Sequence, residues 1–262
     1  MCRLGKAFTL AEVLITLGII GIVAAMTIPT LVANYQKKVL KTQFTKKYAE
    51  ISQAVLLAKS ETNRNFKSYC TLLKTMDADA GKFEYPNKEE CFAIFNKYFK
   101  QVGTCEYKND VVTYNKENTA YTDIGSKANP GKLLADGSCY DMVINSAKLG
   151  FTFDMNGPDK GPNALGHDIF SFHMDNNDYL QPIKQSSIYT DDDRDAAIAV
   201  CEEKYPSKGN YYYSCIAAAE QTGYPCRKDS NQAANGLGCS WYAVHDKCPE
   251  DNTKGYWDCL PK

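Results

Sequence analysis

This sequence lacks the usual signatures of catalysis. Its 262 residues include only three histidines (His167, His173 and His245) and no G-x-S-x-G run that would mark a serine nucleophile. None of its cysteines has C-x-x-C spacing, which zinc ribbons and thioredoxin-like sites need because two sulfurs must meet on one tight turn. A Cys–His pair can still form from distant positions, so the sequence alone does not exclude an anchored enzyme. It is nevertheless the least favoured class. We expect no enzyme.

The chain also lacks an excess of charge of either sign. It has 30 lysines and arginines against 31 aspartates and glutamates, which gives a formal net charge of −1. Proteins that bind nucleic acids usually carry a basic patch or stripe. We therefore expect no nucleic-acid partner.

Cysteine, by contrast, is abundant. Eleven cysteines are far more than a reducing cytosol normally tolerates without metal or catalysis, so disulfides in an oxidising compartment are the better explanation. If the first seven residues are removed, Cys2 leaves with them and an even number remains for complete pairing. Their connectivity cannot be read from the sequence alone. The candidates are Cys70, Cys91, Cys105, Cys139, Cys201, Cys215, Cys226, Cys239, Cys248 and Cys259.

One long apolar segment lies near the amino terminus. Residues 8–33 read FTLAEVLITLGIIGIVAAMTIPTLVA, with Glu12 as the only charge. A helix from Phe8 to Pro29 would be about 32 Å long, which matches a hydrocarbon core of roughly 30 Å. Arg3 and Lys6 precede the segment directly, and no A-x-A cleavage site follows it, as a secretory signal would require. We expect the segment to stay in the mature protein and span a membrane.

The residues around this boundary resemble the type IV prepilin family and the related pseudopilins of type II secretion. A short basic leader, MCRLGKA, is followed by Phe8, Thr9, Leu10, any residue and Glu12, and then by the apolar helix. One departure is Ala7, where the family usually has glycine, although a small side chain is retained. The resemblance ends near Tyr35.

This resemblance implies a processing and assembly pathway. A prepilin peptidase would cut between Ala7 and Phe8 and methylate the new amine of Phe8. The product would be a single-pass inner-membrane precursor that joins a homo- or hetero-oligomeric pilin filament, extracellular or periplasmic. A cytoplasmic assembly ATPase and a platform protein would act indirectly. A minor, tip-located pilin that acts as an adhesin or ligand-binding module is the alternative.

Glu12 is the main candidate for assembly. A carboxylate in lipid is costly, and it could pair with the amine of Phe8 on a neighbouring subunit. The alternative is a side chain that extends to the membrane interface. Gly18, Gly21 and Pro29 could allow local melting or bending in a filament, or serve as packing sites and a kink in any membrane helix.

The positive-inside rule opposes this orientation. Only Arg3 and Lys6 precede the segment, whereas five lysines follow it. The family resemblance and the need for an oxidising compartment both place the carboxy-terminal portion outside. The five lysines are Lys37, Lys38, Lys41, Lys46 and Lys47.

Hydrophobic periodicity predicts an α+β fold, a pilin-like long helix packed on an antiparallel sheet. An apolar stripe with helical spacing continues the first helix to about Ser60, and three strand-like runs follow, two of which alternate apolar and polar residues with the period of half-buried strands. The stripe is Leu40, Phe44, Tyr48, Ile51 and Val55. The expected strands are 139–145, 150–155 and 168–174, with a fourth at 179–183, and shorter helices are expected at 89–101 and 191–205. The expected regions are a leader (1–7), the long helix (8–60, transmembrane over 8–33), a connecting region (61–138), the sheet (139–196) and a cysteine-rich lobe (197–262).

The loop between the two aromatic strands, DMNGPDKGPNALGHD, is rich in side-chain oxygens that could gather round a hard cation such as calcium. It is not an EF-hand, because Gly157 and Pro158 break the required order. The alternative is a turn whose side chains cap their own backbone. A structural calcium is thus the one cofactor considered. The candidate ligands are Asp154, Asn156, Asp159, Asn163 and Asp168.

Aromatic residues gather in the carboxy-terminal lobe. They could stack on sugars or a partner surface, or they could form the core of a small disulfide-stapled lobe, which is the favoured interpretation. They are Tyr211, Tyr212, Tyr213, Trp241, Tyr242, Tyr256 and Trp257.

Overall fold

The computed structural model confirms the expected α+β layout: a long amino-terminal helix, an antiparallel sheet and several disulfides. It describes residues 9–72, 76–77, 82–83, 85–120, 122, 124, 131–144, 149–185, 191–206, 215 and 224–261. The helices are α1 (Leu10–Thr62), α2 (Phe66–Cys70), α3 (Lys88–Asn96), α4 (Asp191–Lys204) and α6 (Ser240–His245), with short 3-10 turns at Leu237–Cys239 (η1) and Tyr256–Asp258 (η2). The strands are β1 (Met76–Asp77), β2 (Lys82–Phe83), β3 (Gln101–Thr104), β4 (Lys132–Leu134), β5 (Cys139–Ile144), β6 (Leu149–Asp154), β7 (Ile169–Met174) and β8 (Leu180–Pro182).

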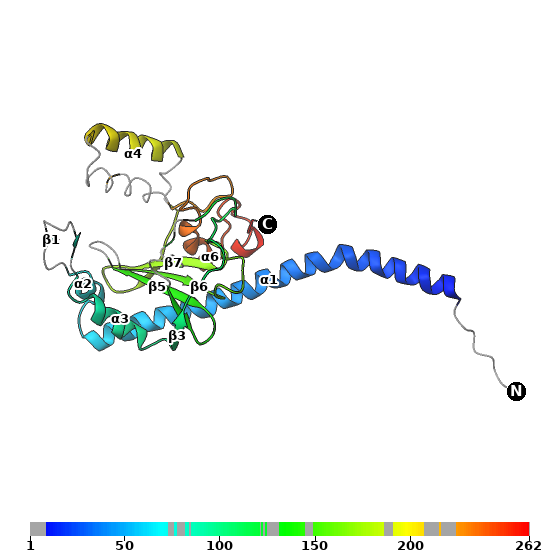
Figure 1. Ribbon diagram of the computed structural model, residues 1–262, viewed down its shortest axis with the longest axis horizontal. Coiled ribbons are helices and arrows are strands. Elements are labelled where there is room, and N and C mark those ends of the chain that lie inside the picture. Colours follow the sequence, from blue (N-terminus) through cyan, green and yellow to red (C-terminus); the bar gives the residue numbers. More distant parts are fainter. Residues whose placement is uncertain are drawn as a thin grey trace.

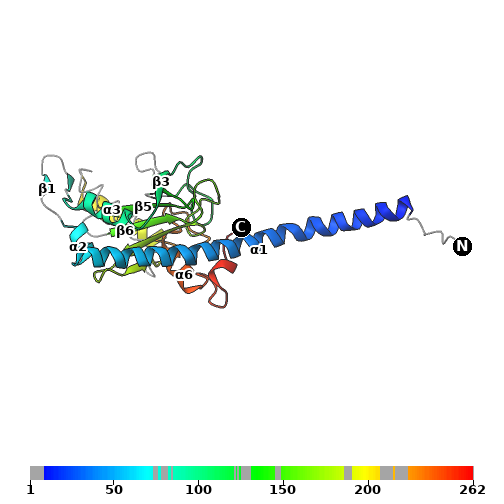
Figure 2. The same ribbon diagram turned by 90° about the horizontal axis from the view of Figure 1, so that it is seen from below.

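Helix α1 is continuous over 53 residues and passes through Pro29. It begins with a capping box, in which Thr9 accepts a hydrogen bond from the backbone of Glu12 and the Glu12 side chain accepts one from the backbone of Thr9. It ends at Asn63, which adopts the left-handed conformation typical of a C-cap. The long helix expected over 8–60 is therefore confirmed from Leu10 onward; Phe8 lies outside the described residues. Its second half lies along the sheet, and its first half extends away from the head (Figures 1 and 2).

The main sheet is a six-stranded antiparallel meander in the order β3-β4-β5-β6-β7-β8. All four expected strands are present, as β5 to β8. Strands β3 and β4 were not predicted, because they have four and three residues and no clear alternation. The connecting region therefore adds two strands to one edge of the sheet.

One face of the sheet packs against α1 and α3. Phe44 of α1 lies 4.6 Å from Phe170 between ring centroids, and Phe95 of α3 lies 4.7 Å from Phe151. The predicted stripe on α1 is confirmed as the docking surface, because Phe44, Ile51 and Val55 are buried.

The prediction of half-buried strands was wrong, since the opposite face of the sheet is also covered. Thr152 and Ser171 alternate with the phenylalanines, yet both are buried and their hydroxyls lie 2.9 Å apart. Ser240 at the start of α6 donates to the Ser171 carbonyl at 2.6 Å. The polar alternation therefore marks a second, hydrogen-bonded interface with the carboxy-terminal lobe, which a period-two pattern cannot distinguish from a solvated face.

Five disulfides account for all ten predicted cysteines, and each cysteine pairs with the next one in the chain. Closing such a loop lowers the conformational entropy of the unfolded chain. For a loop of roughly 15 residues, this stabilises the folded state by about 3 kcal/mol. Cys2 lies outside the described residues. The pairs are Cys70–Cys91, Cys105–Cys139, Cys201–Cys215, Cys226–Cys239 and Cys248–Cys259.

Candidate assembly helix and candidate cation loop

The first half of α1 exposes apolar side chains on every side. Leu14 is 61% exposed and Met26 is 74% exposed. A Cβ built on Gly18 or Gly21 would meet no atom within 4 Å, so the described chain does not cover these glycines. Within the described residues, α1 is the one helix long and apolar enough to cross a membrane. By length and composition it could be a membrane anchor or a signal sequence.

Glu12 lies in the first turn of this helix. Its Oε2 accepts hydrogen bonds from both the backbone N–H and the hydroxyl of Thr9, each at 2.8 Å. Thr9 is thus a partner that we did not single out, although the spacing Thr9-x-x-Glu12 is a capping-box signature readable from the sequence. Ala7 and Phe8 lie outside the described residues, so their proposed processing stays a prediction.

Four of the five lysines after the apolar segment contact the folded head or their own helix. Lys47 forms ion pairs of 2.6 Å with Asp136 and 2.8 Å with Glu50, and Lys46 lies 3.6 Å from Glu50. The other two contact the carboxy-terminal lobe: Lys41 pairs with Asp246, and Lys37 donates to the carbonyl of Asp258 at 3.4 Å. Much of this positive charge is therefore engaged within the chain.

Asp154 ends β6 and is fully buried, at 0% exposure. Its Oδ1 accepts hydrogen bonds from the backbone N–H of Asn156 (3.2 Å) and Gly157 (2.8 Å), and its Oδ2 accepts one from the Tyr107 hydroxyl (2.7 Å). Tyr107 was not predicted as a partner, because nothing in the sequence around it indicates such a contact.

Asp168 precedes β7 and is likewise 0% exposed. Its carboxylate accepts hydrogen bonds from the backbone N–H of Asn163 and of Ala164, each at 2.9 Å. Burial raises the pKa of Asp168, and the nearby carboxylate of Asp154 raises this pKa further. The two carboxylates are thus close enough to interact, and they cap the backbone of the loop as the alternative interpretation expected.

The other three predicted ligands divide into two groups. The amide nitrogens of Asn156 and Asn163 donate to the carbonyls of Gly161 (3.3 Å) and Pro158 (2.9 Å), while the amide oxygens are buried without a hydrogen-bond partner. Asp159, in contrast, has a side chain that is 78% exposed, and it pairs with Lys108 in solvent. The structure therefore keeps four of the five predicted residues in the loop interior and leaves Asp159 outside.

Among the described residues, no three His, Cys, Asp or Glu side chains gather as a metal site would require. His167, near the end of the loop, is buried, and its Nε2 lies 2.9 Å from the Tyr114 carbonyl. Burial, together with the positive charge of Lys116, lowers the pKa of His167 to about 4, so this imidazole is neutral at physiological pH. The loop thus offers two carboxylates and two amide oxygens, all hard ligands.

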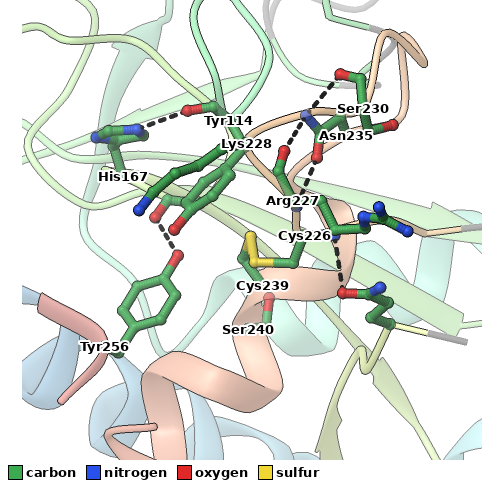
Figure 3. The surroundings of a disulfide bond; sticks show 12 residues. Tyr114, His167, Cys226, Arg227, Lys228, Ser230, Asn235, Cys239, Ser240 and Tyr256 are labelled. Atoms are coloured by element: carbon green, nitrogen blue, oxygen red, sulfur yellow. Dashed lines mark hydrogen bonds between the residues drawn. A yellow bond between two sulfur atoms is a disulfide. The ribbon is translucent and has the colours of Figure 1, made fainter. Parts of the chain in front are cut away.

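The carboxy-terminal lobe holds this loop in place (Figure 3). Its Cys226–Cys239 disulfide lies near Asn235, whose amide donates to the carbonyls of Arg227 and Ser230. The Tyr256 hydroxyl donates to the carbonyl of Gly166, a loop residue directly before His167. The loop and the lobe therefore share one hydrogen-bonded interface.

The aromatic side chains of the lobe serve mainly as its core. Tyr256 and Trp257 are buried, and Trp257 packs 5.5 Å from Phe44 of α1. Trp241 is only partly buried, stacked on His245 and covered by Lys184 at 4.2 Å. The core interpretation is confirmed for Tyr256 and Trp257; residues 211–213 lie outside the described part of the chain.

A family of unknown function (DUF6613) matches residues 30–190. The match starts within α1, after most of the apolar segment, and includes the whole sheet and the loop between β6 and β7. Comparisons with curated proteins and with solved structures found no match. The amino-terminal motif and the described part of the lobe after residue 224 lie outside the matched range.

Proposed function

The chain belongs to this family of unknown function (DUF6613), and we propose that it is a structural subunit of a type IV pilus or pseudopilus filament, processed by a prepilin peptidase and assembled through α1. The observation that supports this proposal most is the division of α1. One continuous helix has an apolar half that the described chain leaves uncovered and a second half that docks on the sheet. Such a helix can stay in the bilayer before assembly and pack against neighbouring helices afterwards.

The lysine contacts support the proposed orientation, which the positive-inside rule opposes. That rule counts lysines and arginines in short loops, whereas long domains translocate largely regardless of charge. Here the lysines after the apolar segment are part of a folded domain, where Lys41 and Lys47 pair with acidic side chains. An outside location also suits a head that is held by five disulfides.

The capping box suggests how Glu12 could act in assembly. Both hydrogen bonds from Thr9 go to Oε2, so Oε1 can still accept a donor from another subunit. We propose that this donor is the amine of Phe8 on a neighbouring subunit, formed by cleavage after Ala7. The capped carboxylate would then be preoriented for a charge-assisted pair in a medium of low dielectric constant.

The substitution Glu12→Gln separates capping from charge. Glutamine also functions at this position of a capping box, so helix initiation should be preserved while the negative charge is lost. We expect normal membrane insertion but loss of filaments from the sheared surface fraction, measured by immunoblotting. Glu50→Gln is the matched control, since it makes the same change in the docked half of α1 and should assemble normally. Normal filament yield from Glu12→Gln would refute the charge-pair account.

Intact mass spectrometry of the native protein tests the processing step directly. We expect a mass that lacks residues 1–7 and carries one additional methyl group, and a shift on reduction that corresponds to five disulfides. A mass that lacks the whole apolar segment would instead identify a signal sequence and would contradict filament assembly through α1. An unprocessed amino terminus would contradict the peptidase step.

A minor, tip-located pilin with an adhesive lobe has less support. The lobe packs on α1 near Lys37 and Phe44, at the side of the head from which the apolar half extends (Figures 1 and 2). Its Tyr256 and Trp257 are buried and cannot stack on a ligand. Immunogold labelling confined to filament tips would favour this alternative, and uniform labelling along the filament would oppose it.

A further inference from the structure

The five disulfides of this chain close five separate loops, one after another along the sequence. No two loops cross and none lies inside another, so each loop ends before the first cysteine of the next. Ten thiols allow roughly 900 different pairings, and this is one of them. A pairing that follows the sequence order so strictly needs a physical cause.

Loop length does not provide that cause. A shorter loop costs less entropy to close, so a fully reduced chain would favour pairs between cysteines that are close in sequence. Cys91, however, lies closer in sequence to Cys105 than to its partner Cys70. The same holds at two later points of the chain. The cysteines that lie closest in sequence to one that is not their partner are Cys91, Cys105, Cys215, Cys226, Cys239 and Cys248.

The folded head also prevents later correction of a wrong pair. Cys70 and Cys91 are 0% exposed, and the two cysteines of the Cys226–Cys239 disulfide are equally buried. Exchange requires a thiolate to reach a sulfur atom of the disulfide, which burial prevents. The native pairs must therefore form before the head closes around them.

The closed loops are local enough for early pairing. Cys70 ends α2 and Cys91 lies within α3, the next helix. Cys105 directly follows β3 and Cys139 begins β5, so the loop between them contains one whole strand, β4. Each of these bonds can form before the later part of the chain is present.

We propose that the disulfides form in sequence order as the chain emerges from the membrane, through a thiol oxidase with a reactive disulfide and without a disulfide isomerase. The thiolate of the first cysteine attacks the disulfide of the oxidase and forms a mixed disulfide with it. The thiolate of the next cysteine to emerge then attacks the sulfur of the first, which releases the oxidase as a dithiol. Two electrons and two protons pass from the two thiols to the oxidase for each bond.

The position of the apolar segment supports this order. All ten paired cysteines follow the apolar half of α1, so in the proposed orientation they reach the outside one after another. Cys2 precedes this segment, and the membrane would separate it from the other ten. The inference rests on the outside location of the head in the proposed function, but not on the assembly of a filament.

Expression of the full-length chain in matched host strains tests the proposal, with the disulfides mapped by peptide mass spectrometry after free thiols are alkylated. Without a disulfide isomerase, we expect the same five pairs. Without the thiol oxidase, the yield of fully paired protein should fall at least about tenfold. Pairs such as Cys91–Cys105 in the isomerase-free strain would overturn the proposal and leave filament assembly untouched. Free thiols at all ten positions in the parent strain would also contradict the outside location of the head.

Two variants test the order of pairing itself. Cys91→Ser removes the second cysteine to emerge, so in the isomerase-free strain we expect Cys70 to pair with Cys105 and the later pairs to shift. Restoring the isomerase should recover the four later native pairs. The matched control removes both Cys70 and Cys91 and should keep those four pairs in either strain. The map reads the pairs whether or not a variant folds. Four native pairs in Cys91→Ser without the isomerase would show that the order of emergence does not set the pairing.

Discussion

The two halves of α1 differ in where their apolar side chains point. Between Leu10 and Gln36 they lie on every side of the helix, with Glu12 as the one charge. Between Lys37 and Thr62 they form a stripe, and Phe44, Ile51 and Val55 are buried against the sheet. A helix that is apolar all round requires a bilayer or other helices, whereas a striped helix requires one partner surface.

This difference shows which half of α1 is stabilised by contacts within the chain. The docked half has aromatic contacts, ion pairs and a head stapled by disulfides. The first half has a capped start and little other contact within the described residues. We infer that the head can fold before assembly and that the first half gains its stability from its surroundings.

Removing residues 1–36 would separate the two halves and should have the largest effect. We expect the protein to move entirely from the membrane fraction to the soluble fraction, because the exposed apolar surface is lost. The head should keep its five disulfides, and its unfolding midpoint should stay within a few degrees of the full-length value. Ultracentrifugation and differential scanning calorimetry measure both quantities. A truncated head that aggregates or unfolds would show that the halves are not independent.

Substitutions of apolar residues test the same comparison at single positions. Phe44→Ala should lower the free energy of unfolding by about 3–5 kcal/mol, because the ring packs against Phe170 and Trp257. Val13→Ala, the control in the exposed half, should change it by less than about 0.5 kcal/mol. Chemical denaturation of the oxidised protein in detergent measures both. Similar losses in the two variants would show that the first half also packs on the head.

Sequence pattern predicted α1 and the strands β5 to β8; α1, β6 and β7 have a repeated apolar pattern or a clear alternation, whereas β8, with three residues, was the weakest of these signals. It failed for β3 and β4, whose short runs gain their place only from pairing in the sheet, β4 with β5 and β3 with β4. It also missed that Thr152 and Ser171 face the lobe, since burial of a polar side chain depends on a distant partner such as Ser240.

The candidate loop was predictable in composition and not in geometry. Its oxygen-bearing residues are visible in the sequence, but the exposure of Asp159 and the contact from Tyr107 depend on how the loop folds. The disulfide pairing was equally unreadable, although each cysteine proved to pair with its neighbour in the chain, as Cys226 does with Cys239.

The smallest expected effect concerns Lys47. Its charge is buried in the docked half of α1, whereas the charge of Glu12 in the first half is exposed. The ammonium side chain of Lys47, only 4% exposed, lies between Asp136 and Glu50. Burial raises the pKa of Asp136, but hydrogen bonds from Lys47 and Ser138 outweigh it and hold this pKa at about 2. Ionised Asp136 therefore adds stability above about pH 4, and this contribution is lost as the pH falls towards about 2.

Replacing Lys47 with methionine should move the pKa of Asp136 back towards its ordinary value. Because Asp136 is partly exposed, we expect a loss of only about 1 kcal/mol at neutral pH. The difference in unfolding midpoint between variant and wild type should shrink between about pH 4 and pH 2, as the wild type loses the pair. Lys46→Met, which removes a longer and more exposed pair with Glu50, should leave the pH profile unchanged. Parallel profiles for Lys47→Met and the wild type would mean that this buried charge does not help to dock the helix.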